Sequence, residues 1–515
     1  MRTCLLLFAA VFAGALFAAD FYVDPANGSA GGNGSAANPW LTLQQVVTDN
    51  LIESQDWNAH PYTAGATLQS KNAGAPVSAG DTIWLRAGYH GQLVLNGYYN
   101  AQPITIRAQA GHTPQLSRVS IIGAQNWVLD GLSISTAHAP VFVNQTIITL
   151  RNDGFWGPAS DLVVRNCDVF CGDDSSTWNA QDWIDNAGTA FDVRSDDTEL
   201  ANNTVRNTRY AIACSGADNH VHDNVIDGFS GDGIRGLGNY GVYEYNVIKN
   251  AIDVGDGHHD DGFQSWSVGP GGVGTGSVVG VVLRGNIFIN HENPSHPMRT
   301  TMQGVGCFDG WFDDWVIENN VVITDHWHGI TLLGARNCRI VNNTVIDLYT
   351  GTPGPSWIQI GFHKDGTPSA DCVIRNNLSN TISVPAGQTN IASDHNILVT
   401  DPTLFFVNPA AYDMRLLPTC AAVDTGSNTL MPSLDADKIG RPYNGVADVG
   451  AYEWHPTGWT GPPGGGGGGD GGDSDGDSGC SSGAPSGWLC TAILALCASL
   501  LAIRPKRRGA AADGN

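Results

Sequence analysis

The stretch Val221-His222-Asp223-Asn224 decides the fold of this chain, because variants of it return through the middle of the sequence. Each copy has an aliphatic residue, a spacer, one or two asparagines, and Val or Ile close behind. From Asn203 to Asn224 to Asn246 the step is about 22 residues, and the longer steps elsewhere suit single coils that carry inserted loops. A repeat this short cannot close a core alone and must stack on its neighbours. The other copies are Val-Val-Arg-Asn at 163–166, Leu-Ala-Asn-Asn at 200–203, Tyr-Glu-Tyr-Asn at 243–246, Leu-Arg-Gly-Asn at 283–286, Val-Ile-Glu-Asn-Asn at 316–320, Ile-Val-Asn-Asn at 340–343 and Ile-Arg-Asn-Asn at 374–377.

Within each copy, apolar residues alternate over short runs, as in Gly329-Ile330-Thr331-Leu332, which predicts strands. Between Ala124 and Asn380 no stretch has convincing helical spacing. Asparagine at a strand end suits a left-handed turn, and stacked asparagine side chains can form a hydrogen-bonded ladder. The sequence therefore predicts an all-β chain that forms a parallel β-helix.

Both ends of the body carry a more specific likeness. The segments 21–28 (Phe-Tyr-Val-Asp-Pro-Ala-Asn-Gly), 38–44 and 79–89, with 422–426, 440–442 and 448–453 at the other end, resemble secreted proteins of the pectate-lyase-like superfamily. The resemblance covers about residues 21–455 and implies a right-handed parallel β-helix. This fold carries lyases, hydrolases, epimerases and inert surface proteins, so it implies no single activity.

The sequence divides into six segments. Residues 1–19 are predicted to be a signal peptide, with Arg2 as the charged start and Leu5–Leu16 as the apolar core. The body comprises an N-terminal cap with the first coils (20–123), the β-helix (124–400) and a closing module (401–457). A linker rich in Gly, Asp and Ser follows (458–487), and then an apolar anchor with a basic tail (488–515).

The C-terminal tail resembles the tripartite sorting tails of Gram-negative surface proteins, especially the Cys-containing myxobacterial type. Cys480 precedes the apolar stretch from Trp488 to Ile503, and four basic residues lie at 504–508. The resemblance implies export to the cell surface or outer membrane, contact with a membrane through the tail, and cleavage near Cys480 that would release the body. The alternative is a plain membrane anchor.

The charge of the chain limits its expected partners, and its cysteine content limits its expected disulfides. The net charge is −24 with only 25 basic residues, which argues against nucleic acid as a partner. The expected partner is a polysaccharide, and the chain is expected to be a monomer. Seven of the eleven cysteines lie in the body, and an odd number argues against a complete disulfide framework. Cys338 and Cys372 each lie five residues before a repeat asparagine, so they are expected on adjacent coils. They predict either a disulfide or stacked buried thiols.

Function in a β-helix must lie on the outer faces and inserted loops, because the coil interior is solid. Aligning the coils on their asparagines places Asp232, Asp261, Gln303 and His328 in one line, with Arg235 and Gln264 in the neighbouring outward line. Long loops that carry His258, His259 and Arg299 are expected to overhang this face. Such a face predicts a groove in which a linear glycan lies along the stack.

The densest segment is 253–264, where His259, Asp260, Asp261 and Gln264 resemble a His-x-Asp-Gly-(Ile/Phe)-Gln phrase of secreted β-helix proteins. Three roles are open for these residues. Asp256, Asp260 and Asp261 could bind calcium as a cofactor. Two carboxylates could act as acid and base in glycoside hydrolysis. Asp261 with a histidine could abstract a proton beside a uronate carboxylate. A structural role in capping the turn is the alternative.

Two further clusters complete the prediction. His328 is a candidate for proton transfer, while Trp327 and Trp266 are expected to stack on sugars. Arg299 is a candidate clamp for a uronate carboxylate or a lyase base. Asp232, Arg235, Gln264 and Gln303 are expected to bind substrate. The sequence thus predicts an extracellular polysaccharide lyase or glycoside hydrolase acting on an acidic polysaccharide. The competing prediction is a surface adhesin or glycan-binding protein without catalysis.

Overall fold

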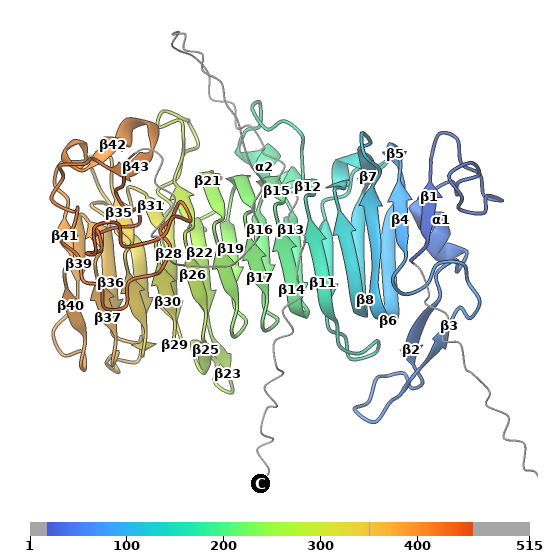
Figure 1. Ribbon diagram of the computed structural model, residues 1–515, viewed down its shortest axis with the longest axis horizontal. Helices are drawn as coiled ribbons and strands as arrows, with labels where there is room; N and C mark the ends of the chain where they lie inside the picture. Colours follow the sequence, from blue (N-terminus) through green and yellow to red (C-terminus); the bar gives the residue numbers. More distant parts are fainter. Residues whose placement is uncertain (1–17, 350, 457–515) are drawn as a thin grey trace, which may run out of the picture. The chain divides into compact units, whose positions relative to one another are not determined.

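The computed structural model describes residues 18–349 and 351–456, and these residues form a parallel β-helix (Figure 1). The predicted linker and anchor, and all but the last two residues of the predicted signal peptide, lie outside this range. Among the described helices, none combines the length and apolarity needed to cross a membrane.

Each coil contributes one strand to each of three stacked columns. The first column bears the predicted site. Its strands pair in parallel, in the order β6 (Gln92–Ala108), β8 (Arg118–Asp130), β10 (Ile148–Arg151), β13 (Thr189–Arg194), β16 (Tyr210–Cys214), β19 (Asp232–Gly236), β22 (Asp261–Trp266), β28 (Gln303–Asp309), β32 (His328–Leu333), β36 (Trp357–Gly361) and β39 (Thr381–Ser383).

The second column joins the first in one 24-stranded sheet, because β6 and β8 are long enough to take part in both columns. Its remaining strands are β1 (Asp20–Val23), β4 (Thr82–Leu85), β11 (Ser160–Arg165), β14 (Asp196–Ala201), β17 (His220–His222), β20 (Val242–Glu244), β26 (Val282–Arg284), β30 (Val316–Glu318), β34 (Arg339–Val341), β37 (Val373–Arg375) and β40 (Ala392–Asp394).

The third column is a separate 12-stranded sheet. Its strands are β5 (Gly88–Tyr89), β7 (Pro114–Leu116), β9 (Ser133–Ser135), β12 (Asp168–Phe170), β15 (Thr204–Thr208), β18 (Val225–Phe229), β21 (Val247–Ala251), β27 (Ile287–Ile289), β31 (Val321–Ile323), β35 (Thr344–Ile346), β38 (Leu378–Ser379) and β41 (Ile397–Leu398).

Short elements decorate the stack. The antiparallel pairs are β2 (Ser54–Trp57) with β3 (Leu68–Lys71), β23 (Val268–Gly269) with β24 (Gly272–Val273), and β42 (Phe406–Asn408) with β43 (Asp413–Leu416). A small parallel sheet contains β25 (Ser277–Val279), β29 (Trp311–Asp313) and β33 (Ala335–Arg336). Helix α1 (Leu43–Thr48) buries Leu43 and Val46 in the same hydrophobic cluster as the coil interior.

The predicted asparagine ladder is present at the turn between the second and third columns. Asn224 Nδ2 donates to Asn246 Oδ1 at 3.0 Å, and Asn246 Nδ2 donates to Asn286 Oδ1 at 3.0 Å. The residue before each rung has a left-handed backbone, for example Asp223 at φ 54°. The copy at 163–166 is shifted by one place, because Asn166 takes the left-handed position and Cys167 the rung.

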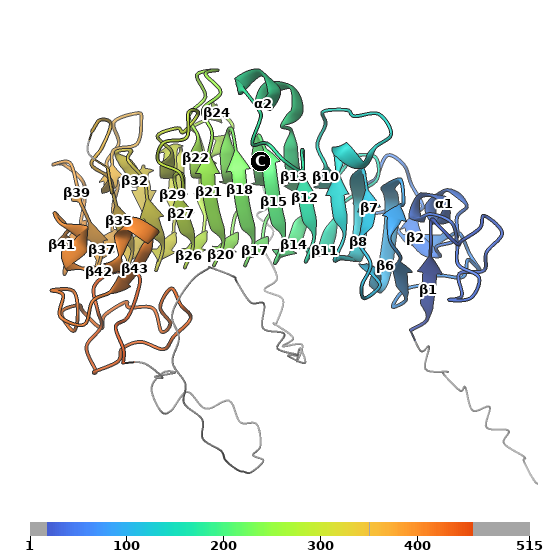
Figure 2. The ribbon, with the colours of Figure 1, turned by 90° about the horizontal axis from the view of Figure 1, so that it is seen from above.

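The expectation of no helix between Ala124 and Asn380 is wrong at one place. Residues Ala180–Asn186 form helix α2, which a capping box from Asn179 and Asp182 begins. Seven residues are too few for a clear helical period, so only the cap signalled it. Figure 2 shows α2 and the closing strands β42 and β43 on opposite sides of the stack.

The closing module covers the outer face of the third column. Phe406, Met414 and Leu416 form a buried cluster with Val321 and Ile346 of that column. Within the module, Arg441 and Glu453 form a wholly buried ion pair at 3.1 Å, and Arg441 Nη1 also donates to Asn319 Oδ1 of the stack at 3.3 Å.

Cys338 and Cys372 lie on adjacent coils, as predicted, since Arg339 pairs with Val373. Their thiols are free, so the predicted disulfide is wrong and the stacked thiols are present. The two residues are in direct contact, since the Cys338 backbone N–H donates to Cys372 Sγ at 3.4 Å. Cys338 Sγ also contacts Phe312 O, and Cys372 Sγ contacts Ala370 O, both at 3.1 Å.

Candidate functional site

Two successive inward-facing residues near the start of β19 and β22 turn the predicted site line outward. Ile234 and Phe263 are buried in the core, and the glycines before them also face inward. A Cβ on Gly262 would lie 2.6 Å from Phe288 Cδ1 in the core. Two successive inward residues mean that Asp232 and Asp261, which precede them, face out of the coil.

The predicted register is confirmed for the first three members of the line. Asp232 lies opposite Asp261, and Asp261 lies opposite Gln303. We expected this line to be open to solvent, but Asp232 is 1%, Asp261 0% and Gln303 7% exposed. The register is therefore right while the exposure is wrong.

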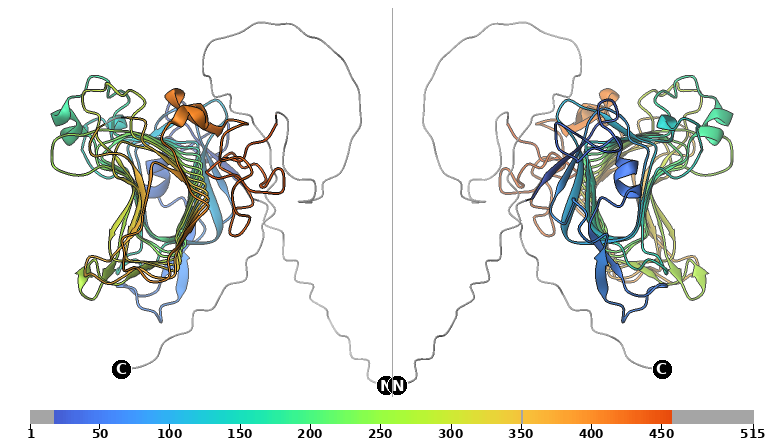
Figure 3. Two further views of the ribbon diagram at one scale, coloured as in Figure 1. Left: turned by 90° about the vertical axis from the view of Figure 1, so that its left-hand side faces the viewer. Right: turned by 90° about the vertical axis from the view of Figure 1, so that its right-hand side faces the viewer.

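The loops beside this line pack together at one corner of the coils. Trp183 of α2 forms a buried cluster with Ile252 and Val254 of one loop, and Met298 of the next loop packs against it. Figure 3, seen along the stack, shows α2 and neighbouring loops gathered at this corner.

The buried side chain of Asp261 pairs with the exposed side chain of His259. The Nδ1 of His259 lies 3.5 Å from the Oδ2 of Asp261, and 64% of the His259 side chain is exposed. Gln264 Nε2 donates to the same oxygen at 3.0 Å. Burial raises the pKa of Asp261 to about 7, while the hydrogen bond to Asp261 raises the pKa of His259. Asp261 therefore orients an accessible imidazole rather than meeting a substrate itself.

The other oxygen of Asp261 faces a glycine of the next coil. Asp261 Oδ1 is buried and has no hydrogen-bond partner. A Cβ on Gly306 would overlap this oxygen and would lie 3.1 Å from Gln303 Oε1. Gly306 thus leaves the room that the buried carboxyl occupies.

Asp232 holds an arginine on the coil before Asp261. Its Oδ2 accepts from Arg235 Nε at 2.5 Å. The guanidinium lies 3.7 Å from the centre of the Tyr210 ring and 5.4 Å from that of Trp266. Arg235 also contacts His258 Nε2 at 3.4 Å. Arg235 therefore connects buried Asp232 to the open face of the first column.

Asp260 is buried beside the pair, but the predicted calcium ligands do not converge. Burial raises the pKa of Asp260 to about 8. Asp256 instead pairs with Arg209 at 2.6 Å. Throughout residues 18–349 and 351–456, no group of three His, Cys, Asp or Glu side chains has the geometry for a metal ion. The side chains of Asp256, Asp260 and Asp261 therefore do not fit the predicted calcium site.

His328 and Trp327 form an aromatic group two coils after Asp261. His328 Nδ1 contacts Thr331 Oγ1 at 3.0 Å, and its ring is 5.1 Å from that of His326. Burial, with a smaller contribution from His326, lowers the pKa of His328 to about 4. The Trp327 side chain is 43% exposed and stacks on Trp357 at 6.1 Å.

Arg299 is already neutralised. Its guanidinium pairs with Asp325 and lies 4.6 Å from the centre of the Tyr349 ring. Only 15% of its side chain is exposed. The structure therefore gives Arg299 a role in holding its loop, in place of the predicted contact with substrate.

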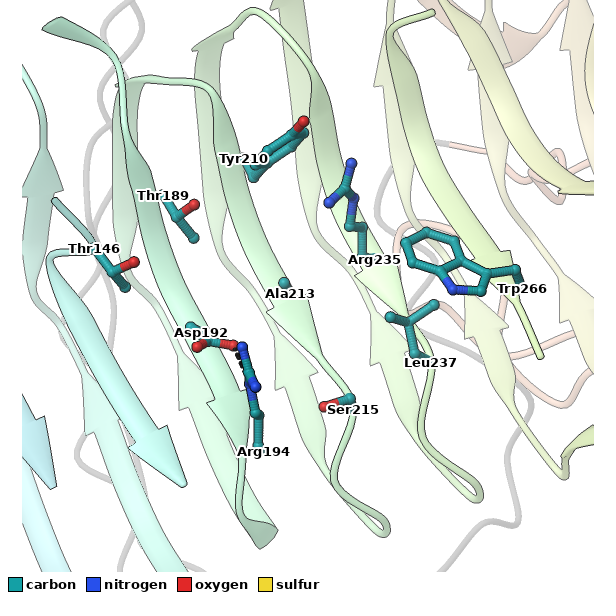
Figure 4. A pocket seen from close by; sticks show the side chains of 10 residues that line it. All are labelled: Thr146, Thr189, Asp192, Arg194, Tyr210, Ala213, Ser215, Arg235, Leu237 and Trp266. Atoms are coloured by element: carbon teal, nitrogen blue, oxygen red, sulfur yellow. Dashed lines mark hydrogen bonds and ion pairs between the residues drawn. The ribbon is translucent and has the colours of Figure 1, made fainter. Parts of the chain in front are cut away.

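Sequence reasoning missed an open groove of about 400 Å³ on the first column (Figure 4). Ala190-Phe191 and Ala211-Ile212 lie in register with Gly233-Ile234. In this register the residues that line the groove fall in the two outward lines of the first column. A second hollow, of about 410 Å³, lies by His258, His259, Asp260 and His326. The first groove is lined by Thr146, Thr189, Asp192, Arg194, Tyr210, Ala213, Ser215, Arg235, Leu237 and Trp266.

No family model matches the sequence, and no curated protein matches it. Among solved structures, the chain is similar to pectate lyase Pel9A (TM-score 0.42, 13% identity, 85% of this chain and 96% of that one). It is also similar to XylC in complex with xylose (0.48, 10%, 84% and 98%). A PL6 family polysaccharide lyase from Pseudopedobacter saltans aligns less fully (0.36, 15%, 68% and 95%). Likeness at this level carries no inference about the chemistry of this chain.

Proposed function

We propose that this chain is an extracellular enzyme that acts on an acidic polysaccharide by proton transfer beside a uronate carboxylate. The observation that carries the proposal is the pair of exposed His259 and wholly buried Asp261, 3.5 Å apart. A buried carboxylate behind an accessible histidine is a general arrangement for acid–base chemistry.

The residues would divide the work as follows. Neutral His259 takes the proton from the carbon beside the uronate carboxylate, and Asp261 holds the ring and stabilises the imidazolium that forms. Arg235 lies on the adjacent coil and pairs with Asp232 through Nε, but unlike Arg299 it lines the open groove, where its terminal N–H groups would bind the substrate carboxylate. In β-elimination, the electron pair of the broken C–H bond forms the new double bond. The C–O bond to the leaving sugar breaks, and its oxygen takes a proton from water.

Elimination suits the geometry better than hydrolysis does. Hydrolysis needs two carboxyl groups that both face the scissile bond. Asp232 and Asp261 have fully buried side chains, and Asp192 in the groove is paired with Arg194 at 2.9 Å. Hydrolysis and a non-catalytic adhesin remain as outcomes that the experiment distinguishes.

The proposal places the enzyme outside the cell, as predicted from residues 1–19 and 458–515, with a membrane contact through the tail. The expected monomer and the expected surface location are parts of this proposal. Calcium enters no step.

The test incubates the full chain with uronate-containing and neutral polysaccharides, with and without calcium. Unsaturated-uronate absorbance that is lost in His259→Gln would support the proposal. The matched control is His220→Gln, because His220 is 41% exposed and pairs with Glu244 at 3.0 Å on the second column. New reducing ends without absorbance would indicate hydrolysis. Binding without any product would overturn catalysis in favour of the adhesin.

A further inference from the structure

The outward lines of the first column differ in charge on the two sides of the Asp261 coil. On the N-terminal side, Arg151 lies directly opposite Arg194 in one outward line, and Arg235 lies in the neighbouring outward line, in register with Ala213 and Asp192. Like charges placed opposite each other on neighbouring strands repel. In a chain with a net charge of −24, Arg151 and Arg194 place two basic side chains side by side on this face, although Asp153 and Asp192 contact them.

Arg151 and Arg194 remain accessible, whereas the Arg235 side chain is 19% exposed and pairs with Asp232. The side chains of Arg151 and Arg194 are 39% and 58% exposed, although each contacts a nearby aspartate at 3.3 Å and 2.9 Å. In Figure 4, Arg194, Arg235 and Trp266 line the same groove, with Ala213 and Ser215 between them. The small residues on the middle coil leave the hollow that a sugar ring would fill.

On the C-terminal side, the outward line that continues from Arg235 and Gln264 is uncharged. Gly306, Thr331 and Gln359 follow in register, with Gly306 and Thr331 buried, so the exposed surface on this side comes from the tryptophans beside the line. Trp357 Nε1 donates to Thr331 Oγ1 at 2.9 Å, which fixes the indole over this line. Trp327 stacks on Trp357 with an angle of 15° between the rings. An exposed, nearly parallel aromatic pair suits the apolar face of a sugar rather than an anion.

We infer that the first column binds a heteropolysaccharide, with acidic sugars on the coils before Asp261 and a neutral sugar on the coils after it. This inference rests on the proposed function and names its substrate class. Coils rise about 4.8 Å each. The three coils from Arg194 to Asp261, and the three from Asp261 to Trp357, therefore span about 14 Å on either side, enough for a short oligosaccharide along the stack.

The test measures binding by the full-length His259→Gln variant, so that turnover cannot interfere. The probes are hexasaccharides of three classes: acidic homopolymers (galacturonate, mannuronate), neutral homopolymers (cellohexaose, xylohexaose) and alternating polymers (hyaluronan, chondroitin). We expect an alternating probe to bind at least about tenfold more tightly than either homopolymer class, because it alone uses both sides of the column.

Two variants locate the halves of the site. Arg151→Gln with Arg194→Gln should weaken the acidic and alternating probes about tenfold at low salt, and much less at high salt. Trp327→Ala should weaken the alternating and neutral probes by about fivefold to tenfold at either salt concentration. Arg165→Gln is the matched control, since Arg165 is 42% exposed and pairs with Asp130 on the second column.

Tighter binding by an acidic homopolymer, or no binding by either alternating probe, overturns the inference. So does an alternating probe whose affinity Trp327→Ala leaves unchanged. The proposed function fails separately. A wild-type chain that makes no product but shows this binding pattern refutes catalysis and keeps the substrate class. An active wild-type chain that lacks this binding pattern supports catalysis and refutes the substrate class.

Discussion

His259 and Asp261 form a pair in which one side chain faces solvent and the other is sealed. Their closest atoms are 3.5 Å apart, yet 64% of the His259 side chain and none of the Asp261 side chain is exposed. Asp261 is turned outward because the two residues after it face the core, and it is then buried by the residues packed around it. A substrate can meet the imidazole and cannot meet the carboxyl.

Asp261→Asn should lower the pKa of His259 toward its ordinary value, because the hydrogen bond to Asp261 is the main cause of the rise. The His259 base works when neutral, so the acid limb of the pH–rate profile should move to lower pH while the rate falls about 10²- to 10⁴-fold. An NMR titration of the His259 ring measures the first effect. An unmoved His259 titration would show that the pair is not coupled.

Asp260→Asn should remove a pH dependence of stability. The pKa of Asp260 is 3.8 before burial and about 8 in the fold. Between these values the unfolded chain is ionised and the folded chain keeps its proton, so the free energy of unfolding falls as pH rises from about 4 to about 8. The wild type should therefore lose a few kcal/mol over this range.

Urea unfolding at pH 4 and pH 8 measures this difference. Asp260→Asn should be more stable than the wild type at pH 8 and similar at pH 4. Asp185→Asn, on the exposed side of α2, is the control and should follow the wild type at both values. Equal pH dependence in Asp260→Asn and the wild type would contradict the buried neutral carboxyl.

Gly306→Ala should disturb the site from the coil after it. The added Cβ would overlap Asp261 Oδ1. Overpacking of this kind destabilises by about 1–3 kcal/mol and should displace the carboxyl from His259. Thermal unfolding and turnover both report it. Gly154→Ala is the matched control, because a Cβ there meets nothing within 4 Å. Full activity in Gly306→Ala would mean that Asp261 has room to move.

Asn286→Ala should break the ladder. Asn286 Oδ1 accepts from both the backbone N–H and the Nδ2 of Asn246, at 3.1 Å and 3.0 Å. Two buried donors would lose their acceptor, which should lower the free energy of unfolding by about 2–4 kcal/mol. Denaturant unfolding measures the loss, with the exposed Asn444→Ala as control. A loss no larger than that of the control would argue against the ladder as a stabilising element.

How much of the site could be predicted depends on which residues lie within the repeat. Asp232, Asp261 and Gln303 were placed in one line because parallel coils keep a fixed register from one asparagine rung to the next. The partner of Asp256 could not be predicted, because Asp256 lies in an inserted loop and pairs with Arg209. The groove at Arg194 does not follow from the asparagine spacing, because its coils align through Phe191, Ile212 and Ile234 instead.

The sequence by itself determined the β-helix, its asparagine ladder and the neighbouring places of Cys338 and Cys372, because these depend on local spacing that repeats at every coil. Only the tertiary structure decided that Asp261 is sealed, that Arg299 is neutralised by Asp325, and that the closing module covers the third column. Those outcomes depend on how loops and segments distant in the sequence pack against the stack. No repeat spacing encodes that packing, because each loop occurs once.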